Sequence, residues 1–524
     1  MQEQVTGTSH RILAFNTLAF TVCFAAWVFN GVMVTFLVDN GVFKWGPAEI
    51  GWLLGIPVLT GSIFRLPVGL LTDRFGGKWV FGALLMLCAI PMYFLGSANT
   101  FMSYALLSGG FGLAGTGFAV GIAYTSVWYP RKWQGTALGI FGAGNAGAAL
   151  TTFLAPALLN YLTAHGANVD NWRRLPQIYA AVLLGMGILF LLFTKNKLPT
   201  SRPETVAHLL SPLKSMRVWR FGLYYFLVFG CFVAFSQWLV PYFVSVYAMS
   251  LVTAGILTSL FSLPSGVIRA LGGWVSDMWG ARRVMYVVLG SSMVLALLLS
   301  VPRMEITSPG KGVAATNNGT VTSVTDTNIK VGQTDYKVNA RSGDFDKIDQ
   351  GALILPTKDS YQTPVVQPGE QVKKKQLLAK ETTRIYFQAN VWIYTALVIL
   401  IGISWGIGKA AVYKFIPEYF PTEVGVVGGT VGVIGGLGGF FCPIIFGYLL
   451  QWTGLWSSCW MLMFVLSVVC LWWLHSVVTR IMRRGAPHLA EEFEHKHEDG
   501  KRPVRAHEPV PASVPAIAVS SSPH

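Results

Sequence analysis

The stretch GSIFRLPVGLLTDRFGGKWV (residues 61–80) recurs as SGVIRALGGWVSDMWGARRV (residues 265–284). An offset of 204 positions brings an arginine, two glycines and an aspartate of the two copies into register: Arg65 with Arg269, Gly69 with Gly273, Asp73 with Asp277 and Gly76 with Gly280. Such a duplication predicts two homologous helical halves that face each other across a cleft.

The composition places this duplication in a membrane. Of 524 residues, 53% are hydrophobic and 12% are charged, whereas an ordinary soluble domain carries about 25% charged residues. This excludes a soluble multidomain enzyme, a disordered scaffold and a disulfide-stapled secreted module. The net charge of +15 does not indicate nucleic-acid binding, because the basic residues stand mainly between and after apolar runs, where orientation signals belong. We expect the lipid bilayer to be the solvent.

The sequence carries no pattern of catalysis or metal binding. The cysteines all fall inside apolar segments without CxxC or CxxxH spacing, and we interpret them as small hydrophobic core residues: Cys23, Cys88, Cys231, Cys442, Cys459 and Cys470. We find no nucleophile–base set and no phosphate-binding loop. We therefore expect no enzymatic activity, no metal and no cofactor.

Twelve apolar runs are long enough to cross a bilayer, for which about 20 residues suffice. They lie near 12–37, 48–72, 78–97, 101–128, 135–161, 175–195, 218–247, 250–275, 283–301, 388–416, 424–451 and 456–480. We predict an all-α membrane protein with twelve transmembrane helices in two six-helix bundles. The first bundle is expected over 1–200 and the second over 218–302 and 388–480, joined by a cytoplasmic linker at 201–217.

The short loops set the orientation. One set of alternate loops is basic and includes Arg74, Lys78, Arg131, Lys132, Arg282 and Arg283, whereas the opposite set is nearly uncharged. By the positive-inside rule the basic loops are cytoplasmic. Twelve spans then place both termini in the cytoplasm of a multi-pass protein of the inner (plasma) membrane. The tail 481–524 ends in a Pro/Ser/Ala-rich stretch and is predicted to be disordered.

Residues 303–387 break the apolar pattern. Short β-type runs alternate there with Gly/Asn/Asp turns, as in GTVTSVTDTNIKVG and GALILP. The parity of the spans predicts an extracytoplasmic β-rich insertion. Its piece PVVQPGEQVKKKQLLAKE is similar to a barrel-sandwich hairpin of the lipoyl or adaptor type. We expect an accessory module rather than the working part.

The duplicated pattern G-x-x-x-D-R-x-G resembles the signature loop of the major facilitator superfamily. The resemblance implies a transporter whose gating residues are Gly69, Asp73 and Arg74 in the first half, and Gly273, Asp277 and Arg282 in the second. Glycine lets helices approach closely, the aspartate is expected to cap a helix N-terminus, and the cations are expected to hold a cytoplasmic gate shut.

Two arginines of the repeat fall inside predicted spans. Arg65 precedes Asp73 by eight residues, which at 1.5 Å per residue is a depth of about 12 Å, close to the middle of a hydrocarbon core about 30 Å thick. Arg269 lies at the same depth by symmetry. A lone arginine there costs at least about 2.5–3.5 kcal/mol, and the spans offer no nearby acid. Either each arginine snorkels or bonds backbone carbonyls in a packed core, or the pair forms an anion site, for which guanidinium geometry is well suited.

Two predicted spans are rich in glycine: GTALGIFGAGNAGAALTTFLAP from Gly135 and GVVGGTVGVIGGLGGFFCP from Gly425. Close helix packing alone could account for either one. The patterns G-x-G-N-x-G and G-x-x-G-G-x-G-G-F also resemble the paired signatures of the nitrate/nitrite porter family within the major facilitator superfamily.

The resemblance to this family implies a site for nitrate and nitrite. Its two arginines correspond to Arg65 and Arg269, its tyrosine and phenylalanine four residues apart to Tyr225 and Phe229, and further residues to Phe118 and Asn145. From the residues alone, the three aromatic side chains would be read as core or lipid-facing. The family match makes them lining residues that sandwich a flat anion.

The coupling mode stays open between two mechanisms. Two arginines without a carboxylate favour nitrate/nitrite exchange, because only a bound anion relieves their repulsion when the cleft closes. Lys409, in WGIGKAAVYKFIPEYFP, stands about 12 Å from the end of its span and resembles the form taken by nitrate/proton symporters. It either couples protons or snorkels to the cytoplasm, as Lys414 is expected to do.

Two alternatives to nitrate transport remain. The chain could carry another small anion, such as formate, a sulfonate or a carboxylate, or it could be a membrane sensor whose working part is the outer insertion. The leading hypothesis is a monomeric secondary transporter whose partners are nitrate, nitrite and, in the symport variant, protons.

Overall fold

The computed structural model describes residues 6–198, 211–341, 357–387, 390–420 and 424–485. Its contacts divide the chain into one unit over Met1–Leu471 and another over Trp472–His524. Of the second unit, the structure describes the end of the last helix. That helix continues to Gly485, so residues 481–485, which the sequence assigned to a disordered tail, are helical, and the rest of the predicted tail lies outside the described residues.

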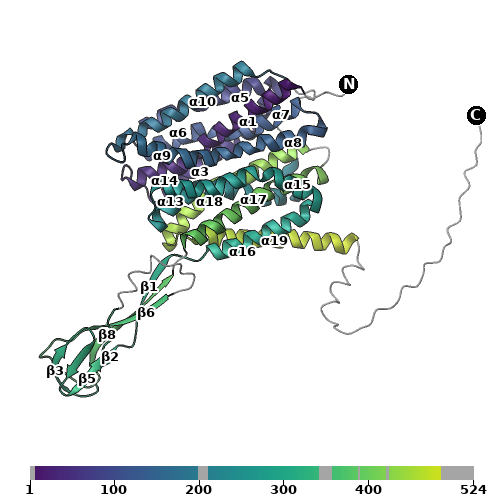
Figure 1. The fold of residues 1–524 in the computed structure, drawn as a ribbon. Helices are drawn as coiled ribbons and strands as arrows, with labels where there is room; N and C mark the ends of the chain where they lie inside the picture. Colours follow the sequence, from purple (N-terminus) through teal and green to yellow (C-terminus); the bar gives the residue numbers. More distant parts are fainter. Residues whose placement is uncertain (1–5, 199–210, 342–356, 388–389, 421–423, 486–524) are drawn as a thin grey trace, which may run out of the picture. The chain divides into compact units, whose positions relative to one another are not determined.

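The first half of the chain is helical from Gly7 to Phe193 (Figure 1). Its elements are α1 (Gly7–Trp27), α2 (Asn30–Asp39), α3 (Pro47–Ile63), α4 (Arg65–Phe75), α5 (Gly77–Phe94), η1 (Leu95–Ser97), α6 (Phe101–Gly112), η2 (Leu113–Thr116), α7 (Gly117–Trp128), α8 (Arg131–Gly142), η3 (Ala143–Ala146), α9 (Gly147–Leu162), η4 (Val169–Arg173) and α10 (Arg174–Phe193). The elements η1 to η4 are short 3₁₀ turns that join or continue α helices.

The second half repeats this plan with the β insertion between its third and fourth spans. Its helices are η5 (Ser211–Lys214), α12 (Met216–Tyr225), the π-helical turn η6 (Phe226–Gly230), α13 (Cys231–Tyr247), α14 (Leu251–Val267), α15 (Arg269–Trp279), α16 (Ala281–Leu299), α17 (Val391–Tyr419), α18 (Val424–Thr453) and α19 (Ser458–Gly485). Most of the predicted linker, up to residue 210, lies outside the described residues.

Among the described residues, eleven helical segments are long and apolar enough to cross a membrane, and the bent pair α14 and α15 supplies a twelfth. The predicted twelve-span, all-α fold is therefore confirmed. The sequence did not predict that spans are broken inside the membrane. Breaks at Phe64 and Ile268 place Arg65 and Arg269 at the first position of a new helix in each half.

A proline accounts for the break in the first half. Pro67 is the third residue of α4, and a proline is tolerated in the first turn of a helix but clashes with the carbonyl four residues earlier in a continuous one. A helix that ran through Phe64 would create that clash at Ile63. The second half has no proline at the equivalent position, but Pro264 lies inside α14, four residues before the break at Ile268.

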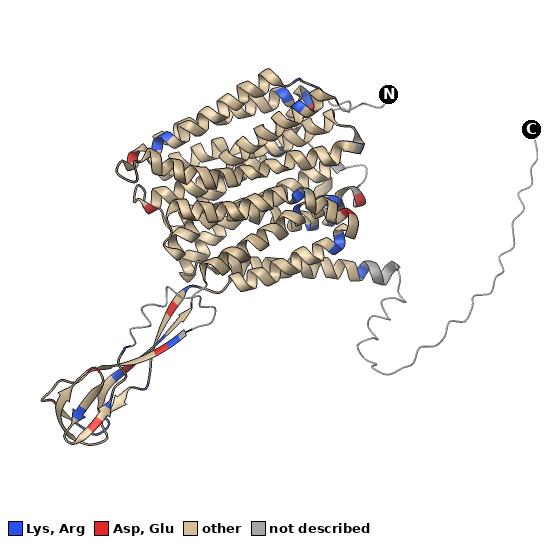
Figure 2. Cartoon of the chain, viewed as in Figure 1, with Lys and Arg blue, Asp and Glu red and all other residues tan. Residues whose placement is uncertain are grey.

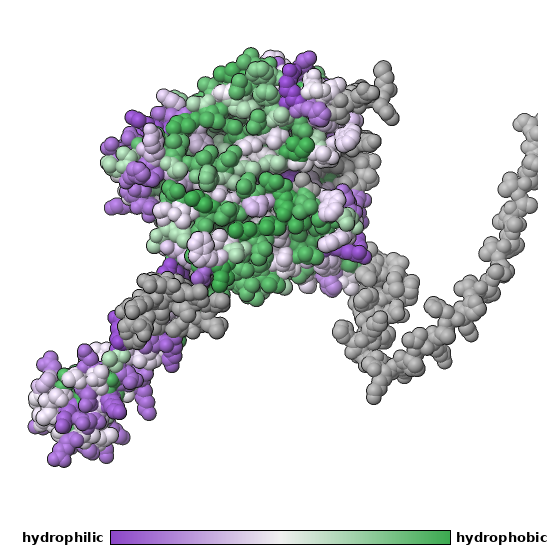
Figure 3. Space-filling view, viewed as in Figure 1, coloured by the Kyte–Doolittle hydropathy of each residue, from purple (hydrophilic) through white to green (hydrophobic). Residues whose placement is uncertain are grey.

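Charged residues lie mainly at the two ends of the helices (Figure 2). The flank between them is hydrophobic (Figure 3), and it exposes large apolar side chains such as Leu106 (69% exposed) and Leu192 (70%). A contiguous apolar surface of this kind needs a non-aqueous solvent. The chain is a multi-pass membrane protein.

The insertion consists of two antiparallel four-stranded sheets. The first is organised around β8 (Leu377–Phe387), which pairs with β1 (Met304–Pro309), β2 (Val313–Ala314) and β6 (Thr357–Pro364). The second has the order β5 (Thr334–Lys337), β4 (Asn328–Val331), β3 (Gly319–Val324), β7 (Gln371–Val372). The predicted β-rich insertion is present.

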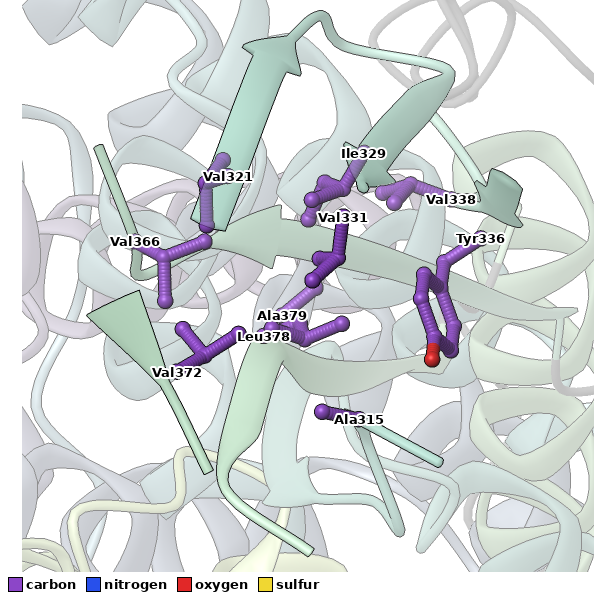
Figure 4. Close-up of a cluster of buried hydrophobic side chains, with 10 residues drawn as sticks. All are labelled: Ala315, Val321, Ile329, Val331, Tyr336, Val338, Val366, Val372, Leu378 and Ala379. Atoms are coloured by element: carbon purple, nitrogen blue, oxygen red, sulfur yellow. The ribbon is translucent and has the colours of Figure 1, made fainter. Parts of the chain in front are cut away.

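The insertion has a hydrophobic core of its own (Figure 4). Its buried residues are Ala315, Val321, Ile329, Val331, Tyr336, Val338, Val366, Val372, Leu378 and Ala379. Nearer the membrane helices, Arg384 of β8 pairs with Glu305 of β1, and the hydrogen bond from Arg384 lowers the pKa of the Glu305 carboxyl. The carboxylate of Glu305 is therefore ionised at neutral pH.

Candidate functional site

Arg65 lies in the interior of the helical unit, where its side chain is only 4% exposed. Its Nη1 donates to the carbonyl of Gly432 on α18 at 2.8 Å, and its Nε donates to the carbonyl of Gly115 in η2 at 3.4 Å. Its Nη2 has no hydrogen-bond partner among the described residues. A buried guanidinium with an unused N–H edge is suited to hold an oxyanion.

Arg269 stands at the equivalent place at the start of α15. Its guanidinium carbon lies 5.5 Å from the ring centroid of Phe118 and 5.3 Å from that of Tyr413. Its side chain also lies against Gly142 of α8, since a Cβ built on this glycine would stand 3.5 Å from Arg269 Cδ. Nη1 of Arg269 is buried and, like Nη2 of Arg65, has no partner among the described residues.

Each arginine reaches from its own half into the other half. Arg65 lies over the Phe229 ring of the second half at 5.5 Å, and Arg269 lies over the Phe118 ring of the first half. Phe118 is shared, because the Arg65 guanidinium carbon is also 5.4 Å from its centroid. Neither arginine forms an ion pair with any carboxylate among the described residues. Two cations that converge without an acid in a low dielectric favour a bound anion.

The aromatic residues named by the family resemblance form one stack beside the arginines. The rings of Tyr225 and Phe229 are parallel within 9° at 4.9 Å, and Phe229 stacks on Phe118 at 6.3 Å. The π-helical turn η6 begins directly after Tyr225 and contains Phe229, and no sequence signal that we used could have found it. The Tyr225 side chain is buried, and its ring meets the Tyr413 ring edge-on at 5.0 Å.

Asn145 lies in the 3₁₀ turn η3 and is fully buried. Neither its Nδ2 nor its Oδ1 has a hydrogen-bond partner among the described residues. Its backbone adjoins Gly266 of α14, where an added Cβ would stand 3.2 Å from the carbonyl carbon of Asn145. Asn145 thus lies at a contact between the two halves, but no contact described here joins its side chain to either arginine.

The two glycine-rich spans serve both packing and the site. In the first, Gly147 is there for packing, because a Cβ on it would stand 2.2 Å from the carbonyl oxygen of Thr21 on α1. In the second, Gly436 faces the site, because a Cβ there would stand 2.5 Å from Ser62 Oγ and 3.2 Å from Arg65 Nη1. Close helix packing therefore explains Gly147, whereas Gly436 also leaves room for the side chains of Ser62 and Arg65.

Lys409 of α17 is fully buried and does not snorkel. Its Nζ donates to the carbonyl of Ser265 at 3.2 Å and to the Ser265 hydroxyl at 3.0 Å, and it lies 3.1 Å from the centroid of the Phe232 ring. All three partners are neutral. Of the two hypotheses from the sequence, the structure removes snorkelling.

The duplicated motif of the second half makes an ionic contact. Asp277 pairs with Lys414 of α17, and Arg282 Nη2 donates to the hydroxyl of Tyr419 at 3.3 Å. Gly273 has no described atom within 4 Å of an added Cβ. The aspartate therefore joins α15 to α17 instead of capping a helix.

The expected helix cap is also wrong for the aspartate of the first half. Asp73 lies inside α4, near its end, so it is not an N-terminal cap. The residue before α5 is Gly76, whose φ of +86° suits glycine and whose cap has no side-chain hydrogen bond. The next residue of the motif, Arg74, lies over the Phe75 ring at 5.5 Å, and Gly69 has no described neighbour within 4 Å of an added Cβ.

The two halves are in tight contact on the side from which the insertion leaves. A Cβ on Gly51 would stand 2.4 Å from the carbonyl oxygen of Pro443, and one on Gly255 would stand 2.2 Å from that of Thr152. These contacts join α3 to α18 and α14 to α9, across the two halves.

Contacts between the two halves are looser at the end that carries the basic loops. Gly69, Gly135, Gly139 and Gly273 all belong to this end, and none has a described atom within 4 Å of an added Cβ. The structure is therefore closed at the insertion end and more open at the basic end.

Three residues of the site were not found by sequence reasoning. The Trp27 ring lies 5.5 Å from the Arg65 guanidinium carbon. The fully buried Ser62 hydroxyl, without a partner among the described residues, stands one turn before Arg65. Tyr413 lies under Arg269 and donates to the carbonyl of Gly428 at 3.2 Å. Tyr413 is four residues after Lys409, and this spacing on one helix face could have identified it.

A site between two duplicated halves, closed at one end and more open at the other, defines a secondary transporter of the alternating-access type. The comparisons agree with this class. The model of the Major Facilitator Superfamily matches residues 16–319 and 382–518.

Curated relatives are similar over nearly the whole chain. The "Probable nitrate/nitrite antiporter NarK1" of Thermus thermophilus is 37% identical over 94% of this chain and 96% of its own length. The "Nitrite extrusion protein" of Bacillus subtilis is 25% identical over 85% of this chain and 88% of its own length. The chain therefore belongs to the Major Facilitator Superfamily and, within it, to the nitrate/nitrite porters, which confirms the resemblance seen in the sequence.

Solved structures support the fold alone. A bacterial homolog of the human lysosomal transporter Spinster, in an inward-facing and occupied conformation, has a TM-score of 0.59 at 14% identity and covers 90% of this chain and 97% of its own. The nucleoside transporter NupG has a TM-score of 0.55 at 12% identity, with coverage of 90% and 99%.

Proposed function

We propose that this chain carries nitrate and nitrite across the inner membrane by alternating access. The observation that supports this most is the reciprocal arginine pair. Arg65 and Arg269 each reach across to the other half and keep one buried nitrogen without a partner among the described residues. A planar oxyanion accepts parallel N–H···O bonds from such groups. The stacked rings of Phe118 and Phe229 exclude water around it.

The orientation follows from the basic loops, which we place in the cytoplasm together with both termini. The conformation described above is then closed outside and open toward the cytoplasm. The chain works as a monomer in this proposal, because each half supplies one arginine and the site is complete within one copy.

Exchange is the primary mode that we propose. Closing an empty cleft would confine two guanidinium groups together, whereas an anion between them offsets the repulsion. The loaded carrier therefore changes conformation more readily than the empty one. The name of the Thermus relative as an antiporter agrees with this mode.

The test uses purified protein in liposomes. With nitrite inside and labelled nitrate outside, uptake is expected to be fast, and with empty vesicles it is expected to be slow. Competing formate, methanesulfonate and acetate should leave uptake unchanged. Strong inhibition by one of these anions, with weak inhibition by unlabelled nitrate, would assign the site to that anion instead.

A second mode, nitrate/proton symport, is favoured by one observation. Lys409 is fully buried and has only neutral partners among the contacts described above, Ser265 and Phe232. An amine without a counter-ion can exchange its proton during the cycle and so link anion movement to the pH gradient.

Replacing Lys409 with methionine tests this role. If symport operates, an inward proton gradient accelerates nitrate uptake into empty vesicles by the wild-type protein, and Lys409→Met abolishes that acceleration while nitrate/nitrite exchange persists. The matched control is Lys44→Met, at an exposed loop lysine, which should respond like the wild type. An unchanged pH response in Lys409→Met would refute the role.

A further inference from the structure

Three arginines gather around Tyr419 at the basic end of the second half. Arg217 of α12 has its guanidinium carbon 5.5 Å from the centroid of the Tyr419 ring. Arg282 of α16 donates from Nη2 to the Tyr419 hydroxyl at 3.3 Å. Arg220 of α12 lies close enough to Arg217, Arg282 and Tyr419 for their charges and dipoles to act on it. The anion site proposed above uses none of these residues.

Arg220 is the buried member of this arginine cluster. Its side chain is only 8% exposed, and it forms no hydrogen bond or ion pair with any described residue. Its guanidinium carbon lies 5.3 Å from the ring centroid of the neighbouring Phe221. None of its nitrogens is among the fully enclosed polar atoms without a partner, so a ligand can reach them. A guanidinium has five N–H donors, and taking it out of water without a partner is costly.

The cluster stands at the level of the lipid headgroups. Arg220 follows the exposed Met216 by one helical turn and Trp219 by one residue, so it lies on the side of α12 that these exposed side chains occupy. Trp279, at the end of α15 on the same end of the helical unit, is exposed as well. Exposed tryptophans are enriched at the membrane–water interface.

The cluster has no carboxylate partner in the part of the chain that the structure describes. Asp277 is engaged by Lys414, and the exposed Glu418, next to Tyr419 in the sequence, forms no ion pair with a described residue. Three like charges at the edge of a low-dielectric region repel one another unless an anion lies among them. Basic pockets between transmembrane helices favour anionic headgroups.

We propose that the arginine cluster binds the phosphate of an anionic phospholipid, of which phosphatidylglycerol is the simplest case. Arg220 donates to the phosphate oxygens as a planar fork, and Arg217 and Arg282 flank the same group. A zwitterionic headgroup would bring its own cation close to three guanidinium groups, so it binds less well. This lipid site is independent of the anion that the protein transports.

Such a lipid would join three helices of the second half. The arginines come from α12 and α16, and Tyr419 is the last residue of α17. A phosphate among them offsets their repulsion and holds the three helix ends together. The anionic lipid should therefore stabilise the folded protein, and it should do so through Arg220.

The test measures lipid retention by the full-length protein in detergent. Native mass spectrometry compares phosphatidylglycerol, phosphatidylethanolamine and phosphatidylcholine with identical acyl chains. The wild type should retain phosphatidylglycerol about tenfold more strongly than phosphatidylcholine, the difference that one charge-assisted hydrogen bond supplies. Glycerol phosphate in millimolar excess should leave the lipid bound. Displacement by this soluble compound would assign the site to a free phosphate and overturn the lipid.

Two variants and a control locate the site. Arg220→Gln should abolish the preference for phosphatidylglycerol, and Arg217→Gln, at an exposed position where folding is not at stake, should reduce it by a smaller factor. The control Arg283→Gln removes the same charge from an exposed arginine next to the cluster and should keep the preference.

Thermal unfolding gives a second readout. Added phosphatidylglycerol should raise the unfolding temperature of the wild type and of Arg283→Gln but not that of Arg220→Gln. Equal retention of the three lipids by the wild type, or an unaltered preference in Arg220→Gln, would overturn the proposal. If Arg220→Gln does not fold, an unaltered preference in Arg217→Gln has the same meaning.

Discussion

Arg65→Lys and Arg269→Lys should each lower nitrate exchange by about ten- to hundredfold, although both keep the positive charge. A hydrogen bond to a charged group contributes about 1.5–3 kcal/mol, and lysine cannot reproduce the planar fork of a guanidinium. Arg65 would also lose its bond to the carbonyl of Gly432, which joins the two halves. The measurement is counterflow of labelled nitrate in liposomes.

The matched control is Arg174→Lys, at an exposed arginine at the start of α10, which should leave exchange unchanged. Thermal unfolding of the same preparations separates function from folding. Because a buried cation is costly and Arg65 has no acidic partner among the described residues, Arg65→Met should leave the unfolding temperature unchanged or raise it while exchange is lost. Retained exchange in either lysine variant would show that the arginine pair does not form the anion site.

Much of this site followed from two patterns in the sequence. The repeat aligned Arg65 with Arg269, and the absence of acids from the spans made an anion the simplest partner. Both arguments depend on spacing and composition, which a sequence shows directly. The stacking of Tyr225 and Phe229 required the family resemblance, because an aromatic residue in an apolar run is equally consistent with core packing.

The parts that sequence reasoning missed depend on tertiary contacts. The role of Asp277 was wrong because its partner, Lys414, is 137 residues away on α17, and local motif geometry suggested a helix cap instead. The snorkelling alternative for Lys409 failed for a similar reason, since Ser265 and Phe232 are brought to it by packing. The helix breaks at Phe64 and Ile268 were missed because an apolar run shows the length and composition of a span but not a change in the direction of its helix axis.

Gly230→Ala is expected to be strongly destabilising. A Cβ at this position would stand 2.3 Å from the carbonyl oxygen of Gly435 and 2.6 Å from Gly438 Cα, all on backbone atoms of α18 that cannot rotate away. Overpacking of this kind costs typically about 1–3 kcal/mol. Thermal unfolding in one detergent should show a clear drop in the unfolding temperature.

The control for this change is Gly290→Ala on α16, where no described atom lies within 4 Å of the added Cβ. There the alanine should be neutral or stabilising, by up to about 1 kcal/mol, because alanine favours a helix interior more than glycine does. Gly230 also ends the π-helical turn that holds Phe229, so Gly230→Ala should reduce nitrate exchange even at temperatures where the protein remains folded. Equal unfolding temperatures for the two variants would mean that η6 and α18 can separate freely, and the close packing inferred from Gly230 would then be wrong.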